Sequence, residues 1–177
     1  MDKSQYKNVY VFVEQRDGVV QNVALELLGK ARELADALHE QVIALLLGKG
    51  VKDKADELIA AGADVVLSIE ADELAQYTTE PYAQAITQVI HERKPSILLI
   101  GATSIGRDLG PRLSARIGTG LTAAGRTDEN DKLLISDLEA EIRNSNNIAG
   151  INFLNVTAAN GSHNTYPPVI YSGLQPG

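Results

Sequence analysis

The sequence predicts an α/β fold of three layers, in which a mostly parallel sheet carries helices on both faces. Apolar runs of strand length alternate with amphipathic stretches of helix length through the amino-terminal half of the chain. One run, at residues 42–47 (VIALLL), is continuously apolar, as expected for a strand covered on both faces. Strand–helix–strand units join through right-handed crossovers, which make neighbouring strands parallel.

The chain is expected to form one domain over residues 1–177, because 177 residues fit the usual size of a single domain. Within it, residues 1–125 are predicted to form the βαβ core. Residues 126–177 are predicted to add extra edge strands and loops. The predicted arrangement is Rossmann-like.

The first strand is predicted over residues 8–14 (NVYVFVE), a β-branched and aromatic run that ends at the turn signal Arg16-Asp17-Gly18. A helix follows over residues 21–39, where apolar side chains recur at steps of three or four positions. The second strand, residues 42–47, ends at the glycines of residues 48–50.

A short helix is predicted over residues 52–61, with Gly62 placed to form a left-handed cap. Residues 64–69 (DVVLSI) form the third predicted strand, and residues 72–79 a polar loop.

Pro81 suits the first turn of a helix that runs to about Arg93. Pro95 marks its end, and the fourth strand is predicted over residues 96–100. Another helix opens directly after this strand and continues to Ile117.

Beyond Gly120 the pattern changes, because short candidate strands are separated by polar turns instead of strong helices. They lie at residues 133–135, 148–156 and 169–171. We expect them to be edge strands, and the sequence leaves antiparallel pairing open.

Composition excludes several classes of function. The net charge is −7 and the basic residues are spread along the chain, so we expect no nucleic-acid partner. The chain has no cysteine, which excludes disulfides and thiolate metal sites. The longest apolar stretch, residues 42–47, is too short to span a bilayer, and residues 1–7 lack an apolar signal segment. We therefore expect a cytoplasmic protein without membrane insertion.

The best candidate site is the segment 101–109 (GATSIGRDL), which follows the fourth strand and opens a helix. Its small residues expose backbone N–H groups at a helix amino terminus, which suits an anion such as a phosphate. It is not a P-loop, since Arg107 and Asp108 stand where lysine and a hydroxyl residue are required, and its spacing does not fit G-x-G-x-x-G.

A purely structural interpretation of this segment remains open. Gly101 and Gly106 then only permit a tight turn. Asp108, Arg112 and Arg116 form a solvated i, i+4 charge ladder on the helix surface.

No catalytic or metal-binding residues are predicted. The three histidines, His39, His91 and His163, are isolated in sequence and have no metal-ligand spacing. No serine lies in a G-x-S-x-G nucleophile elbow, and no acid/base pair is apparent.

The run at residues 97–123 (ILLIGATSIGRDLGPRLSARIGTGLTA) closely resembles a segment of electron transfer flavoprotein alpha subunits. Residues 9–18 and 62–70 are similar to their counterparts in the same family, so the resemblance covers about residues 1–125. It departs further on, at Ala124, where the family usually has aspartate.

This resemblance implies an adenine-nucleotide-hydrolase-like fold and a role as an electron carrier subunit without catalytic residues of its own, and not as an enzyme. Such subunits pair with a beta subunit of similar fold and pass electrons between flavin enzymes through bound FAD, with a flavin dehydrogenase as redox partner. The amino-terminal alpha domain is mainly a platform, and a separate carboxy-terminal domain chiefly holds FAD. We therefore expect weak or no FAD binding by this chain alone.

The resemblance makes Gly101, Thr103, Gly106 and Arg107 candidate contacts near the cofactor or partner. Two alternatives stay open. The chain is a stand-alone adenine-nucleotide-binding domain that takes AMP or ATP at this loop, or it is a structural module with a decayed site.

Overall fold

A computed structural model describes residues 5–119, 121–124, 150–154 and 169–172. Its main sheet has seven strands in the order β7-β8-β6-β1-β4-β5-β9, and every neighbouring pair is parallel. The strands are β1 (Val9–Val13), β4 (Val42–Gly48), β5 (Val65–Glu70), β6 (Ile97–Gly101), β7 (Leu121–Ala124), β8 (Gly150–Leu154) and β9 (Val169–Ser172).

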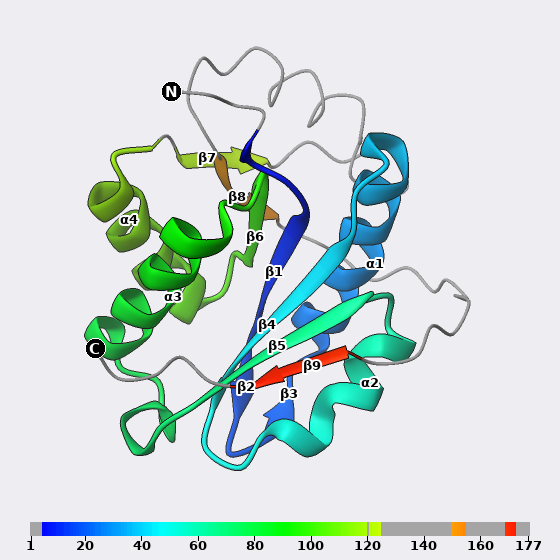
Figure 1. Ribbon diagram of the computed structural model, residues 1–177. Coiled ribbons are helices and arrows are strands. Elements are labelled where there is room, and N and C mark those ends of the chain that lie inside the picture. Colours follow the sequence, from blue (N-terminus) through cyan, green and yellow to red (C-terminus); the bar gives the residue numbers. More distant parts are fainter. Residues whose placement is uncertain (1–4, 120, 125–149, 155–168, 173–177) are drawn as a thin grey trace.

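Helices cover both faces of the sheet, which confirms the predicted three-layer α/β class (Figure 1). Helices α1 (Asn22–Leu38) and α2 (Ala55–Ala60) pack on one face, and α3 (Thr79–Arg93) and α4 (Ser104–Ile117) on the other. Two short 3₁₀ helices, η2 (Lys52–Lys54) and η3 (Asp72–Leu74), follow β4 and β5.

The two-sided core explains why the central strands have no polar alternation. In β1, Val9, Val11 and Val13 pack toward α1, whereas Tyr10 and Phe12 pack toward α3 and α4. A strand buried on both faces needs apolar side chains at every position.

A two-stranded hairpin, β2 (Gln15–Arg16) and β3 (Val19–Val20), lies between β1 and α1. Its turn residues Asp17 and Gly18 both have positive φ, 51° and 76°. An Asp-Gly pair with this geometry is typical of a two-residue hairpin turn. The turn was predicted from the sequence, but the strands on either side of it were not.

Two boundaries differ from prediction within the core. The short helix predicted at 52–61 is divided into η2 and α2. The polar loop expected at 72–79 contains η3, whose Leu74 is buried. One turn of 3₁₀ helix brings this apolar side chain back into the core, which polarity alone did not reveal.

The carboxy-terminal strands correct the expectation for the tail. Strand β8 is not at an edge, because it lies between β6 and β7. Strand β9 is at an edge, beside β5. Both pair parallel with their neighbours, and the connections before them, residues 125–149 and 155–168, have the length that a parallel crossover needs. The candidate strand at 133–135 lies outside the described residues.

None of the helices within the described residues is long and apolar enough to cross a membrane.

Candidate functional site

The sheet has a topological switch point between β1 and β6. The chain passes from β1 to β4 and β5 on one side, whereas β6 lies on the other side of β1. Glu14 follows β1 directly, and the candidate segment follows β6 directly. Open α/β sheets take ligands in the crevice at the carboxyl ends of such strands. The predicted segment therefore lies at the edge of the sheet where a ligand is expected.

Thr103 is the N-cap of α4. Its backbone is extended, with φ −80° and ψ 176°, and its Oγ1 accepts a hydrogen bond from the Gly106 N–H at 3.1 Å. A hydroxyl in this position satisfies one of the amide donors that a helix leaves free at its start. The Thr103 hydroxyl is therefore already engaged with the helix that the segment 101–109 was predicted to open.

The same hydroxyl donates a hydrogen bond to Glu14 Oε2 at 2.6 Å. Glu14 is 4% exposed, and its other oxygen accepts a hydrogen bond from Arg16 Nη2 at 3.2 Å. This carboxylate thus links the end of β1 to the N-cap of α4. Sequence analysis missed Glu14. Its place at the end of a fully apolar strand was the available signal, because carboxylates are rarely buried without partners.

Neither Gly101 nor Gly106 has room for a side chain. Neither Gly101 nor Gly106 has a positive φ, so the expected tight turn is not what they provide. A Cβ at Gly106 would overlap the carbonyl oxygen of Gly101, and a Cβ at Gly101 would lie 2.7 Å from Val23 Cγ2. The segment is therefore packed directly against β6 and α1.

Arg107 differs from the other three predicted contacts, because its residue is exposed. Gly101 and Gly106 are buried, and Thr103 is half-buried. The fold thus brings all four residues to one end of the sheet, and of the four only Arg107 is exposed.

Two members of the charge ladder expected along α4 also contact the chain before and within α3. Asp108 Oδ2 accepts hydrogen bonds from the hydroxyls of Thr79 and Tyr77, the latter at 2.7 Å. Arg116 forms an ion pair with Glu80. Asp108, Arg112 and Arg116 are all exposed. Besides the two hydrogen bonds to Asp108, the positive charge of Arg112 also lowers the pKa of Asp108, as their i, i+4 spacing implies. The contacts to α3 and the chain before it were not predicted, because spacing within one helix says nothing about a segment packed beside it.

The bonds to Asp108 change two pKa values. Hydrogen bonds from Thr79 and Tyr77 lower the pKa of Asp108. Burial and the bond to Asp108 raise the pKa of Tyr77 above its usual value. The Tyr77 ring also packs edge-on against Tyr82, with the ring centroids 5.0 Å apart. These contacts connect α4 to the start of α3 and to the residue Tyr77 before it.

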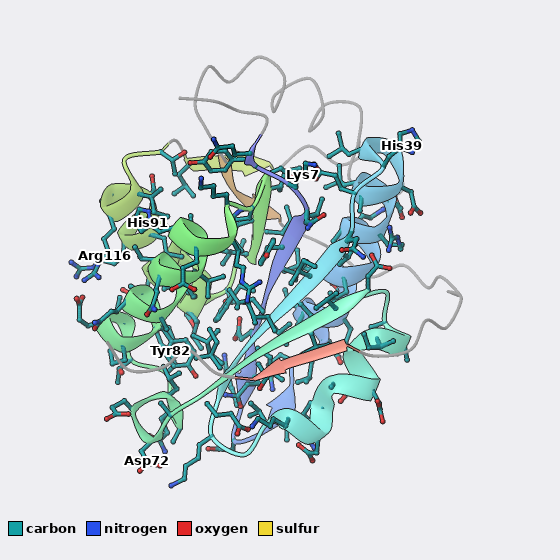
Figure 2. All side chains as sticks on the ribbon, in the orientation of Figure 1. Lys7, His39, Asp72, Tyr82, His91 and Arg116 are labelled. Atoms are coloured by element: carbon teal, nitrogen blue, oxygen red, sulfur yellow. The ribbon has the colours of Figure 1, made fainter. Side chains whose placement is uncertain are left out.

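The histidines are separated in space as they are in sequence. Figure 2 shows His39 at the end of α1 and His91 on α3, on different sides of the molecule. Within the described part of the chain, no group of three or more His, Cys, Asp or Glu residues could hold a metal ion. His163 lies outside the described residues.

Comparison with known proteins identifies the family. A model of the electron transfer flavoprotein domain matches residues 9–128. The electron transfer flavoprotein subunit alpha of Clostridium acetobutylicum is 52% identical over 123 residues, which are 70% of this chain and 37% of the relative. The alpha subunit of Megasphaera elsdenii is 50% identical over 123 residues, 70% of this chain and 36% of the relative.

A more distant relative, Protein FixB of Rhizobium meliloti, is 40% identical over 122 residues, 67% of this chain and 35% of the relative. The chain thus spans about a third of the length of these curated relatives. The match contains the four strands β5, β4, β1 and β6 and the whole candidate segment. The chain belongs to the electron transfer flavoprotein family and corresponds to the amino-terminal part of its alpha subunits.

Proposed function

We propose that this chain is the amino-terminal platform of an electron transfer flavoprotein alpha subunit, which carries electrons between flavin enzymes when it is paired with a beta subunit and FAD. The observation that carries the proposal is the extent of the match, residues 9–128, at about half identity to alpha subunits. Within the described residues, no group of three or more His, Cys, Asp or Glu side chains is placed to hold a metal ion. The part played by the chain is that of an electron-carrier component, with the redox chemistry left to the flavin and to a flavin dehydrogenase that donates or accepts the electrons.

FAD belongs to the assembled protein in this proposal, and its binding by the chain alone is weak or absent. The hydroxyl of Thr103 and the space beside Gly101 and Gly106 are taken up by internal contacts. Arg107 has the exposed position and the permanent charge that suit contact with a flavin phosphate or with an acidic partner surface. We therefore propose Arg107 as the contact residue and the other three as its support.

A chimera provides the test. Residues 9–128 of this chain replace the matching segment of the Clostridium acetobutylicum alpha subunit, and the product is co-expressed with its beta subunit. The expected result is a heterodimer with flavin absorption bands that passes electrons at a rate within about tenfold of the parent, since half of the matched residues are identical. A chimera that folds but neither assembles nor holds flavin would contradict the proposal.

Arg107→Ala in this chimera tests the contact residue. Arg112→Ala is the matched control, because it removes the same charge from another exposed position of the same helix. We expect Arg107→Ala to weaken beta-subunit or flavin retention about tenfold and Arg112→Ala to leave it nearly unchanged. Equal effects of the two substitutions would show that only net charge matters.

The 177-residue chain by itself supplies the second arm. It is purified alone, its visible spectrum is recorded, and the masses of released ligands are measured. We expect a colourless protein. Flavin retained by the chain alone would overturn the platform assignment, and release of AMP or ATP would favour the adenine-nucleotide alternative.

A further inference from the structure

A buried carboxylate stands in the crevice where an open α/β sheet ordinarily takes a ligand. Glu14 is 4% exposed and follows β1 at the switch point. Both of its oxygens have donors, Thr103 Oγ1 at 2.6 Å and Arg16 Nη2 at 3.2 Å. The carboxylate therefore has no free oxygen that needs an outside partner for stability.

The hydrogen bonds fix the direction of the Thr103 hydroxyl. Its oxygen accepts from the Gly106 N–H, and its single proton is donated to Glu14. The chain of bonds thus links an amide at the amino terminus of α4 to a negative charge. An anion near this terminus is favoured by the partial positive charge of the helix. Glu14 supplies that anion from within the protein.

A phosphoryl group that entered the crevice would meet this charge directly. Two negative charges a few ångströms apart repel each other strongly where water is excluded. It would also compete for Arg16, the cation beside the crevice that is already paired with Glu14. The Thr103 hydroxyl, the Gly106 N–H group and the Arg16 guanidinium are therefore already engaged within the protein.

The neighbouring strand shows the same arrangement. After β4, the backbone N–H groups of Val51 and Lys52 donate to Glu70 Oε1 at 2.8 and 3.2 Å. Glu70 comes from the carboxyl end of β5. The start of η2 is thus satisfied directly by a carboxylate of the chain itself, whereas the start of α4 is satisfied by the Thr103 hydroxyl, which in turn donates to Glu14.

We propose that Glu14 is an internal anion that closes the switch-point crevice to phosphoryl ligands, so that this chain binds neither AMP nor inorganic phosphate there. The inference does not depend on the proposed function. It assigns the carboxyl edge between β1 and β6 a closed, structural state, and it leaves the exposed surface around Arg107 as the place for contacts.

The test titrates the full chain with inorganic phosphate and with AMP and monitors the backbone amide NMR signals of residues 103–106. The wild type is expected to show no saturable shift at these residues. Glu14→Ala is expected to bind phosphate at least about tenfold more tightly than the wild type, because it frees Arg16 and Thr103 and removes the repelling charge.

Glu33→Ala is the matched control, since it removes an equal charge from an exposed site on α1. It is expected to bind phosphate as weakly as the wild type. Thermal melts without ligand show whether each variant folds. If Glu14→Ala does not fold, Glu14→Gln takes its place, because the amide keeps the shape without the charge and should give a gain of about threefold.

Two results would overturn the proposal. One is a saturable shift of residues 103–106 in the wild type with either probe. The other is a folded Glu14 variant that binds phosphate no better than Glu33→Ala.

Discussion

Glycines lie at the carboxyl ends of both β4 and β6, but they are packed against different kinds of atoms. After β4, a Cβ at Gly48 would meet side-chain atoms, Val51 Cγ1 at 2.6 Å and Gln15 Nε2 at 2.9 Å. After β6, a Cβ at Gly106 would meet the backbone oxygen of Gly101. Side chains can turn aside, whereas backbone in a parallel sheet cannot move without breaking hydrogen bonds. The loop after β6 is therefore the less adaptable of the two.

The carboxylates near these two glycines, Glu70 and Glu14, also differ, because the one near β6 is the more buried. Glu70 is partly exposed and accepts directly from backbone N–H groups. Glu14 is buried and acts through the hydroxyl of Thr103. Hydrogen bonds to a buried charge are harder to replace than those at the surface, because water cannot substitute for the lost partner. The comparison predicts larger effects of substitution after β6 than after β4.

The largest effect is expected for Gly106→Ala. The methyl group overlaps backbone, so the amino-terminal turn of α4 must move away from β6, at a cost of about 3 kcal/mol or more in the free energy of unfolding. Urea denaturation measures it. The control is Gly29→Ala in the middle of α1, where no atom lies within 4 Å. That change should stabilise the chain by about 0.5–1 kcal/mol. Equal results at both positions would contradict the close packing of the loop.

The next effect is expected for Thr103→Val, which keeps the shape but removes the hydroxyl. The helix loses its cap and Glu14 loses a donor, which together should cost about 2–3 kcal/mol. Thr103→Ser retains the hydroxyl and should cost less than about 1 kcal/mol. Thermal unfolding followed by circular dichroism compares the stability of the two variants with that of the wild type. A Ser variant as unstable as the Val variant would show that the hydroxyl contributes nothing.

A smaller effect is expected for Gly48→Ala, about 1–2 kcal/mol, since Val51 and Gln15 must shift. The double substitution Gly48→Ala/Val51→Ala removes one of the obstructing groups. If the clash is the cause, the double variant is less destabilised than the sum of the two single variants. Strict additivity in denaturation experiments would disprove this explanation.

The smallest effect is expected at the junction of α3 and α4, in Tyr77→Phe. The pKa of Asp108 is lowered in the folded protein, so its carboxylate stabilises the fold at pH values above its unfolded pKa near 3.8. This contribution is lost as the pH falls through the folded pKa. The site is exposed, so Tyr77→Phe should cost less than about 1 kcal/mol at neutral pH.

The same variant should flatten the decline in melting temperature below about pH 4, because Asp108 then loses one of its two donors. Melting curves from pH 2 to 7 measure it, with Tyr6→Phe as a control at a residue before the sheet. An unchanged decline would mean that Tyr77 does not set the titration of Asp108.

The local features of the core could be predicted from sequence, because they depend on neighbouring residues. The apolar run 42–47 identified a buried strand, and the segment 101–109 was correctly predicted to open a helix after the fourth strand. The bridge between Glu14 and Thr103 could not be predicted, since the two residues are 89 positions apart. Nothing in the pattern of one segment shows which side chain of another will meet it.

The strand neighbours of the tail were unpredictable for a related reason. The residues of β8 are apolar enough to indicate a strand, but strand periodicity does not identify the partner strand. Strand β7, with the sequence LTAA, has little β-branched or aromatic character and was not predicted at all. The family assignment came from the long match at residues 97–123, which no argument from periodicity would have supplied.

The strand order also means that an incomplete chain exposes the edges of the central strands. The outer strands of the four-strand core, β5 and β6, receive their outer neighbours β9 and β8 only from residues after 149. A nascent or truncated chain that ends earlier leaves both of these strands with an unpaired row of backbone groups. Such rows recruit other chains and promote aggregation. Strands β8 and β9 therefore cover the outer edges of β6 and β5, and proteolytic loss of residues 150–177, about a sixth of the sequence, should yield an insoluble product.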